Sequence, residues 1–143
     1  MMNNVNLAAK EIQNLISANF ERMVAFEQAA FNAATPQLKQ YFEEKADESE
    51  NNITELNAML HNLNESSFDV EQEGKSLLGT THLFTGQKNI NSLLKHIQYL
   101  EKTVMNWYRK GMTNLKGLSH NNTQVLSKQY MGLQASYVYV LNC

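Results

Sequence analysis

Two carboxylates in this sequence fall within apolar segments, where a charged group needs a partner. Glu27 follows Phe26, and Glu101 follows Leu100, each among apolar residues at helical spacing. A carboxylate that is removed from water is stabilised only by an opposite charge or by hydrogen bonds. Hard divalent cations bind carboxylate oxygens. Glu27 and Glu101, together with Glu48 from the acidic run 43–50, are therefore the candidate metal ligands of the chain.

A complete di-iron centre is not expected, because its most specific motif is missing. In four-helix bundles such a centre takes a Glu from each of two helices and a Glu-x-x-His motif from each of the other two. The histidines all lack a carboxylate three residues before them: His61, His82, His96 and His120. The segment from Asn122 onward contains no Asp, Glu or His. We therefore expect no metal ion and no other cofactor.

Two interpretations of the buried carboxylates remain open. In the first they are structural: a hairpin turn near residue 34 places Glu27 level with Lys45, which predicts an ion pair in the core. The same folding places Glu101 level with Tyr137, whose hydroxyl can donate a hydrogen bond. Buried polar pairs of this kind fix helix register in some bundles. In the second interpretation the three Glu residues named above are remains of a carboxylate site, or they bind a single cation.

Other polar residues give weaker signals for chemistry. Ser49 and Asn52 are three residues apart on an inward-facing side of their helix, but neutral side chains are poor ligands for iron. We expect them to hold a water molecule or to hydrogen-bond across helices. No Ser/His/Asp arrangement, phosphate-binding loop or dinucleotide motif is recognisable. Cys143 is the only cysteine, so no intrachain disulfide can form. We therefore expect a non-enzymatic protein.

The charge of the chain also limits the class of partner. Among 143 residues there are 12 Lys and Arg against 14 Asp and Glu, which gives a net charge of -2. Nucleic acids and anionic membranes bind strongly basic protein surfaces, and this chain has a small negative charge, so neither is expected as a partner. The first residues form neither a basic nor an apolar leader, and apolar runs are short. These features predict a cytoplasmic protein.

Proline and glycine mark where the helices that carry these residues begin and end. The one proline, Pro36, follows Thr35, a pair that is typical of a helix start. All six glycines lie between Gly74 and Gly132, so the first 73 residues contain one interruption. Turn-forming residues gather in 62–88 and again in 117–123. We predict four helices in a single all-α domain over residues 1–143.

The long connection between the second and third helices decides the predicted topology. About 24 residues can reach across the whole bundle, so the third helix can run parallel to the second. The apolar residues of this connection would lie against the side of the bundle: Leu77, Leu78, Leu83 and Phe84. This predicts a ferritin-like, up-down-down-up bundle with one long crossover. The run 137–140 is assigned to the end of the fourth helix, with a short strand as the alternative.

The layout resembles a known protein family. The features that carry the resemblance are Asn14-Leu15-Ile16 early in the first helix, Leu83-Phe84-Thr85-Gly86 at the end of the crossover, and Glu101 and Tyr108 in the third helix. The family consists of uncharacterised bacterial four-helix-bundle proteins of the ferritin-like group. The resemblance implies a fold and a domain of unknown function, and no activity.

Association with another protein is the other class of function that the sequence suggests. The first helix carries apolar side chains over about half of its circumference, together with alanines that permit close helix approach. This predicts a homodimer through the first helix or through the crossover. The alternative is that packing within the bundle buries the whole apolar face. The sequence names no other protein partner.

Overall fold

The described part of the chain consists of long helices. The computed structural model describes residues 4–70, 89–115 and 120–143. Within these ranges the helices are α1 (Asn4–Phe31), α2 (Pro36–Asn62), α4 (Ile90–Asn114) and α5 (His120–Leu141). The run 137–140 belongs to α5, and no strand occurs in the described ranges, so the strand alternative is wrong. The predicted all-α bundle is confirmed.

Local signals set the ends of these helices. The Oγ1 of Thr35 accepts a hydrogen bond from the backbone N–H of Leu38 at 3.2 Å, and Pro36 occupies the first turn of α2. At the other end of α2, Asn64 has a φ of 60°. The N–H groups of Asn64 and Glu65 donate to the carbonyls of His61 and Leu60, which closes the helix with a left-handed residue.

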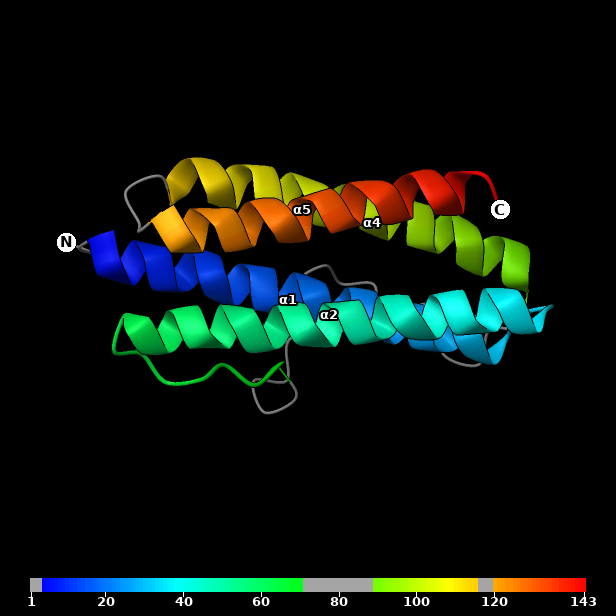
Figure 1. Ribbon diagram of the computed structural model, residues 1–143, viewed down its shortest axis with the longest axis horizontal. Helices are drawn as coiled ribbons and strands as arrows, with labels where there is room; N and C mark the ends of the chain where they lie inside the picture. The colour runs from blue at the N-terminus through cyan, green and yellow to red at the C-terminus, as the bar shows by residue number, and fades with distance from the viewer. Residues whose placement is uncertain (1–3, 71–88, 116–119) are drawn as a thin grey trace.

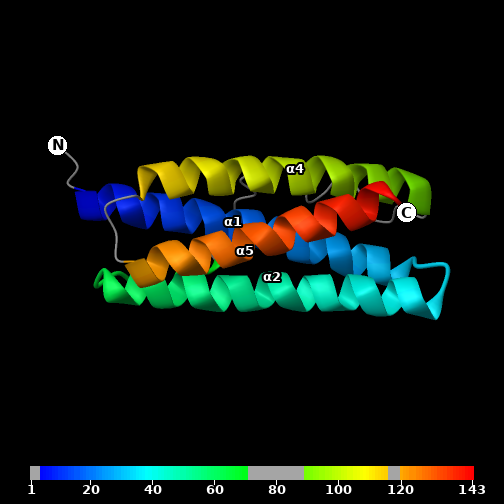
Figure 2. The same cartoon turned by 45° about the horizontal axis from the view of Figure 1, so that its top comes forward.

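The helices form an up-down-down-up bundle. α1 and α2 are joined by a short turn and run antiparallel, and α2 and α4 run in the same direction (Figures 1 and 2). α1 packs against α2 and α4, while α5 packs mainly against α4 and more lightly against α2. The predicted packing of Leu77, Leu78, Leu83 and Phe84 falls in segment 71–88, outside the described residues.

The core runs along the axis of the bundle. Its largest apolar members come from all four helices: Ile12, Leu15, Ile16, Phe26, Phe42, Leu56, Leu60, Leu93, Ile97, Leu100, Tyr108, Leu126 and Leu133. Several polar side chains are equally buried in the middle of the bundle. None of the helices in the described ranges combines the length and apolar character needed to cross a membrane.

Candidate functional site

A guanidinium group occupies the middle of the bundle. Arg22 of α1 is completely buried, with its guanidinium carbon 5.1 Å from the centre of the Phe26 ring. Its Nε donates to Glu101 Oε1 of α4 at 2.5 Å. Its two terminal nitrogens donate to α2, Nη1 to Ser49 Oγ at 2.8 Å and Nη2 to Glu48 Oε1 at 2.9 Å. One side chain therefore ties together three helices.

The ion pairs around Arg22 are balanced in charge. Lys45 Nζ donates to the second oxygen of Glu48 at 3.0 Å, so two cationic groups face the carboxylates of Glu48 and Glu101. The backbone of α5 closes over Glu48 at Gly132, where a Cβ atom would lie 3.4 Å from both carboxylate oxygens. The backbone of α5 therefore passes at about van der Waals distance from the Glu48 carboxylate.

The environment shifts the protonation of these groups in different directions. Burial alone would raise the pKa of Glu48, but the charges of Arg22 and Lys45 outweigh it and hold the pKa below its usual value. Burial is the stronger influence on Glu101 and keeps its pKa above the usual value despite Arg22. Burial also lowers the pKa of Arg22, but the two carboxylates reverse this and raise it overall.

A second polar layer lies beside the first and extends to the fourth helix. Asn19 Nδ2 donates to the hydroxyl of Tyr108 at 2.7 Å, and that hydroxyl donates to Gln129 Oε1 at 2.6 Å. Asn52 Nδ2 donates to Asn19 Oδ1 at 3.0 Å, and Gln129 Nε2 donates to Glu55 Oε1 at 2.9 Å. The two layers form the buried polar network of this protein.

Two buried polar atoms in this part of the bundle, Glu101 Oε2 and Ser136 Oγ, take no part in the hydrogen bonds described above. Within the part of the chain that the structure describes, neither Glu101 Oε2 nor Ser136 Oγ makes a hydrogen bond of standard geometry, although Ser136 lies close enough to Glu101 to favour the charged form and so to lower the pKa of its carboxyl. Both side chains are fully buried. Since Glu101 is bonded through one oxygen only, its carboxylate is less well satisfied than that of Glu48.

Comparison with known proteins assigns the chain to a family. Residues 8–114 match DUF2383, a domain of unknown function. The chain belongs to the DUF2383 family. The match includes α1, α2 and α4 with Arg22, Glu48 and Glu101, and it ends before α5. No match was found among curated proteins. The expectation of a domain of unknown function is confirmed.

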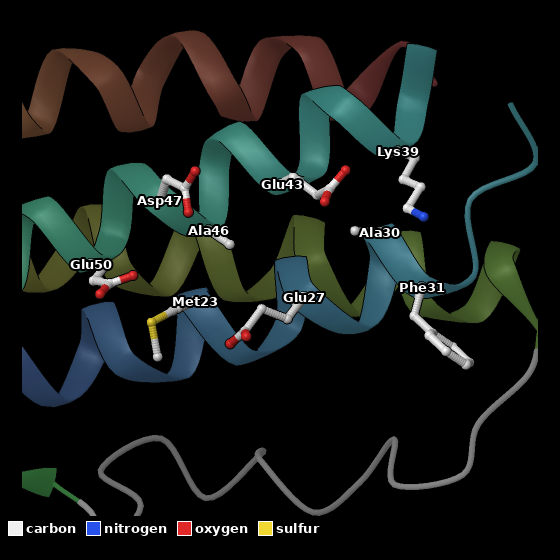
Figure 3. A pocket seen from close by; sticks show the side chains of 9 residues that line it. All are labelled: Met23, Glu27, Ala30, Phe31, Lys39, Glu43, Ala46, Asp47 and Glu50. Carbon is white, nitrogen blue, oxygen red and sulfur yellow. The ribbon is translucent and has the colours of Figure 1, made fainter. Parts of the chain in front are cut away.

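The predicted core pair of Glu27 and Lys45 is not formed in the DUF2383 chain. Lys45 pairs with Glu48, three residues further along α2, and Glu27 is exposed. Figure 3 shows Glu27 in a groove between α1 and α2, on the side of Asp47 and Glu50. Partial burial, followed by the charges of Glu50 and Asp47, raises the pKa of Glu27. The prediction failed because the buried face of α1 is centred on Arg22 rather than on Glu27.

The predicted partner of Glu101 was also wrong. Its bonded partner is Arg22 of α1, whereas Tyr137 is only half-buried on α5. The fully buried residue at this part of α5 is Ser136, one position away. The spacing along the chain predicted which turn of α5 lies near Glu101, but it did not predict the rotation of α5 about its own axis.

The prediction for Ser49 and Asn52 is confirmed in one of its forms. Both side chains hydrogen-bond across helices, Ser49 to Arg22 and Asn52 to Asn19. Arg22 and Asn19 were not predicted from the sequence, although they lie at helical spacing between Leu15 and Phe26. That spacing was the available signal, but Arg and Asn side chains are exposed in most proteins, so the spacing alone does not predict their burial.

The core residues that the structure describes are arranged around Arg22 and not as the ligands of a di-metal centre. In the described ranges no three His, Cys, Asp or Glu side chains are grouped as metal ligands. Of the candidate ligands, Glu48 and Glu101 come together, but both bind the guanidinium of Arg22, and Glu27 is exposed. A dication between these carboxylates would meet the positive charge of Arg22, and the nearby Ser49 and Asn52 are weak neutral donors.

Proposed function

We propose that this protein is a non-enzymatic, ferritin-like four-helix bundle of the cytoplasm that has a structural or protein-interaction role. In this proposal the ion pairs of Arg22 stand where related bundles hold a di-iron centre. The buried polar network then sets the register of the helices, and the outer faces of the bundle carry the function.

The hydrogen bonds made by all three guanidinium nitrogens of Arg22 are the observation that supports this proposal. Its three nitrogens donate to Glu101, Ser49 and Glu48, at distances of 2.5 to 2.9 Å. Charge-assisted hydrogen bonds in a buried site are strong, and removing one partner leaves an uncompensated charge. A metal ion would therefore have to displace Arg22 before it could use either carboxylate.

A divergent metal-binding or oxidative-stress protein is the second candidate function. The observation that favours it is Glu101 Oε2, a buried carboxylate oxygen that makes no hydrogen bond of standard geometry in the described part of the chain. On this alternative Glu101 and Glu48 bind one cation with incomplete ligation. Glu27 is exposed in the groove between α1 and α2, so it is the weakest of the three candidate ligands.

Elemental analysis distinguishes the two candidates. The protein is produced in medium containing iron and manganese, purified without chelators, and compared with the Glu48→Gln/Glu101→Gln double variant. We expect far less than one metal ion per chain in both proteins. One metal ion per chain in the wild type and none in the double variant would overturn the proposal and establish the alternative.

A further inference from the structure

The charged residues of this chain are separated between its two ends. Residues 1–70 contain eleven Asp and Glu against four Lys and Arg. Residues 89–143 contain six Lys and Arg and a single acid, Glu101, which is buried and bonded to Arg22. The outer surface of α1 and α2 is therefore mainly negative, and that of α4 and α5 mainly positive. Surfaces of opposite charge on identical molecules attract one another.

The negative charge is concentrated in the groove between α1 and α2. This groove has a volume of about 490 Å³ and contains the carboxylates of Glu27 on α1 and of Glu43, Asp47 and Glu50 on α2 (Figure 3). Among the described residues that line it, Lys39 is the one cation, so four carboxylates and one ammonium group give a formal charge of -3. The repulsion between these carboxylates favours a cationic group beside them.

The floor of the groove is apolar. Ala30 and Ala46 are buried there, one from each helix, and the half-buried Met23 lies beside them. Phe31 also lines the groove and is 90% exposed. An apolar floor between carboxylates fits a ridge in which an apolar side chain is flanked by cationic ones.

The exposed side of α4 carries such a ridge. Lys95, Tyr99, Lys102 and Asn106 are spaced at i, i+4, i+7 and i+11, so they lie on one face of the helix. All four are exposed, and Tyr99 is 59% exposed between the two lysines. We call these four residues the α4 ridge. The one carboxylate within α4, that of Glu101, is buried on the other side of the helix.

The α2 side of the groove repeats the spacing of the α4 ridge. Four of its residues are also spaced at i, i+4, i+7 and i+11: Lys39, Glu43, Ala46 and Glu50. The two lysines of the ridge are seven residues apart, and so are the two glutamates of this set. Each pair therefore spans about 10.5 Å along its helix, at a rise of about 1.5 Å per residue.

The two sets match level by level when the helices run antiparallel. Tyr99 then lies level with Ala46, and the two lysines of the ridge lie level with the two glutamates. The neutral Asn106 lies level with Lys39, so like charges do not meet. A parallel arrangement would instead place Tyr99 level with Asp47. Both the charges and the apolar groups therefore favour the antiparallel arrangement.

We propose that the α4 ridge of one copy of this chain docks into the α1–α2 groove of a second copy, with the two helices α4 and α2 antiparallel. Among the described helices, α2 and α4 do not contact each other, because they lie at opposite corners of the bundle. One copy can therefore use its ridge and its groove at the same time, and copies join head to tail. This inference deepens the proposed interaction role and rests on it.

The contact is expected to be weak and sensitive to salt. Exposed ion pairs each contribute little, and one helix face in one groove is typical of a transient complex. Charges act over about 30 Å at about 0.01 M salt but over only about 3 Å at about 1 M. At the lower salt concentration we expect the mass to rise above the 16.3 kDa of the monomer between about 0.1 and 1 mM protein. At the higher one the protein stays monomeric.

Sedimentation equilibrium with charge-reversed variants tests the contact. A chelator is present, so that no divalent cation bridges the carboxylates. The ridge variant is Lys95→Glu/Lys102→Glu, and the groove variant is Glu43→Lys/Glu50→Lys. Each variant by itself is expected to stay monomeric at low salt, because like charges then face each other in the contact. Circular dichroism checks that each variant is folded.

A matched control separates this contact from a general effect of net charge. Lys10→Glu/Lys128→Glu changes the net charge as the ridge variant does, but at two exposed positions outside the ridge and the groove. This control variant is expected to associate at low salt as the wild type does. Loss of association in the control as well as in the ridge variant would overturn the inference.

Combinations of the variants test the head-to-tail geometry. The ridge variant keeps a native groove, and the groove variant keeps a native ridge. An equimolar mixture is therefore expected to form pairs of twice the monomer mass that do not grow further. A chain with all four ridge and groove substitutions has reversed charges on both surfaces and is expected to associate again at low salt.

Three other results would contradict the proposed docking. A wild type that stays monomeric at low salt overturns the inference and leaves the two surfaces to partners other than a second copy. An association that persists at about 1 M salt is not based on these charges. A chain with all four substitutions that stays monomeric shows that the ridge and the groove do not meet.

Sedimentation and elemental analysis give separate answers on the docking and on the proposed function. A monomeric protein without bound metal rejects the docking and leaves the non-metal core proposal standing. A protein that associates as described and contains one metal ion per chain supports the docking and rejects the non-metal core.

Discussion

The side chain of Arg22 shows how one buried charge can be accommodated in a helical bundle. Its guanidinium presents several N–H donors in a fixed planar arrangement, which here reach two helices other than its own. Glu101 and Glu48 supply the negative charge, and the hydroxyl of Ser49 accepts a hydrogen bond from the third guanidinium nitrogen. Phe26 lies against the guanidinium, so the group is enclosed by both ionic and apolar neighbours.

Replacing Arg22 is expected to destabilise the protein through Glu101. Arg22→Met keeps an unbranched apolar side chain but leaves the Glu101 carboxylate buried without its cation, which costs about 3–5 kcal/mol in the free energy of unfolding. The double variant Arg22→Met/Glu101→Met removes both charges and should recover most of that loss. Urea unfolding of the wild type, both single variants and the double variant measures the coupling.

The opposite outcome would be additive losses in the double variant. That result would mean that Arg22 and Glu101 contribute through packing alone, and that their ion pair has no role in stability. A Lys10→Met variant, changed at an exposed position of α1, serves as the control for removing a positive charge.

At the scale of the helices, the boundaries follow from local chemistry. Thr35 and Pro36 start α2, Asn89 accepts bonds from the first turn of α4, and Asn64 ends α2 in a left-handed conformation. The face that each helix buries depends less on the local sequence than the helix boundaries do. In α1 the half-buried Met23 and the exposed Phe31 belong to the apolar stripe by sequence, yet the deeply buried side carries Arg22.

The start of α2 gives a prediction at this scale. Thr35→Ala removes the acceptor for the N–H of Leu38 and should lower the free energy of unfolding by about 1 kcal/mol. Thr35→Ser keeps the acceptor and should lie close to the wild type. Both are measured by urea unfolding. Equal stability of the Ala and Ser variants would show that water replaces the cap at this exposed turn.

At the scale of the whole molecule, α5 is the least closely packed of the four described helices. It packs mainly against α4, and its polar anchor is Gln129, which accepts from Tyr108 and donates to Glu55 of α2. α1, in contrast, packs along both α2 and α4. A segment with fewer such contacts unfolds locally at a lower free-energy cost, so the bundle is not expected to be uniformly stable.

Hydrogen exchange should show this difference directly. Amides in the middle of α5 should exchange roughly tenfold faster than those of α1, which corresponds to about 1.4 kcal/mol less protection. Mass spectrometry of peptides from the two helices makes the comparison. Equal protection of α1 and α5 would mean that the bundle opens only as one unit.

The sequence alone determined the number and order of the helices, their ends and the crossover topology. These depend on caps, on proline, and on apolar spacing, which act within a few residues or along one connection. It also indicated that Ser49, Asn52 and Glu101 lie inside the bundle. What the tertiary structure decided is which polar groups meet. Arg22 and Glu101 are 79 positions apart, and their contact depends on the rotation of each helix about its own axis. Successive residues of a helix are rotated by about 100°, so Glu27 and Tyr137 were predicted to be in the core although they lie beside the buried face.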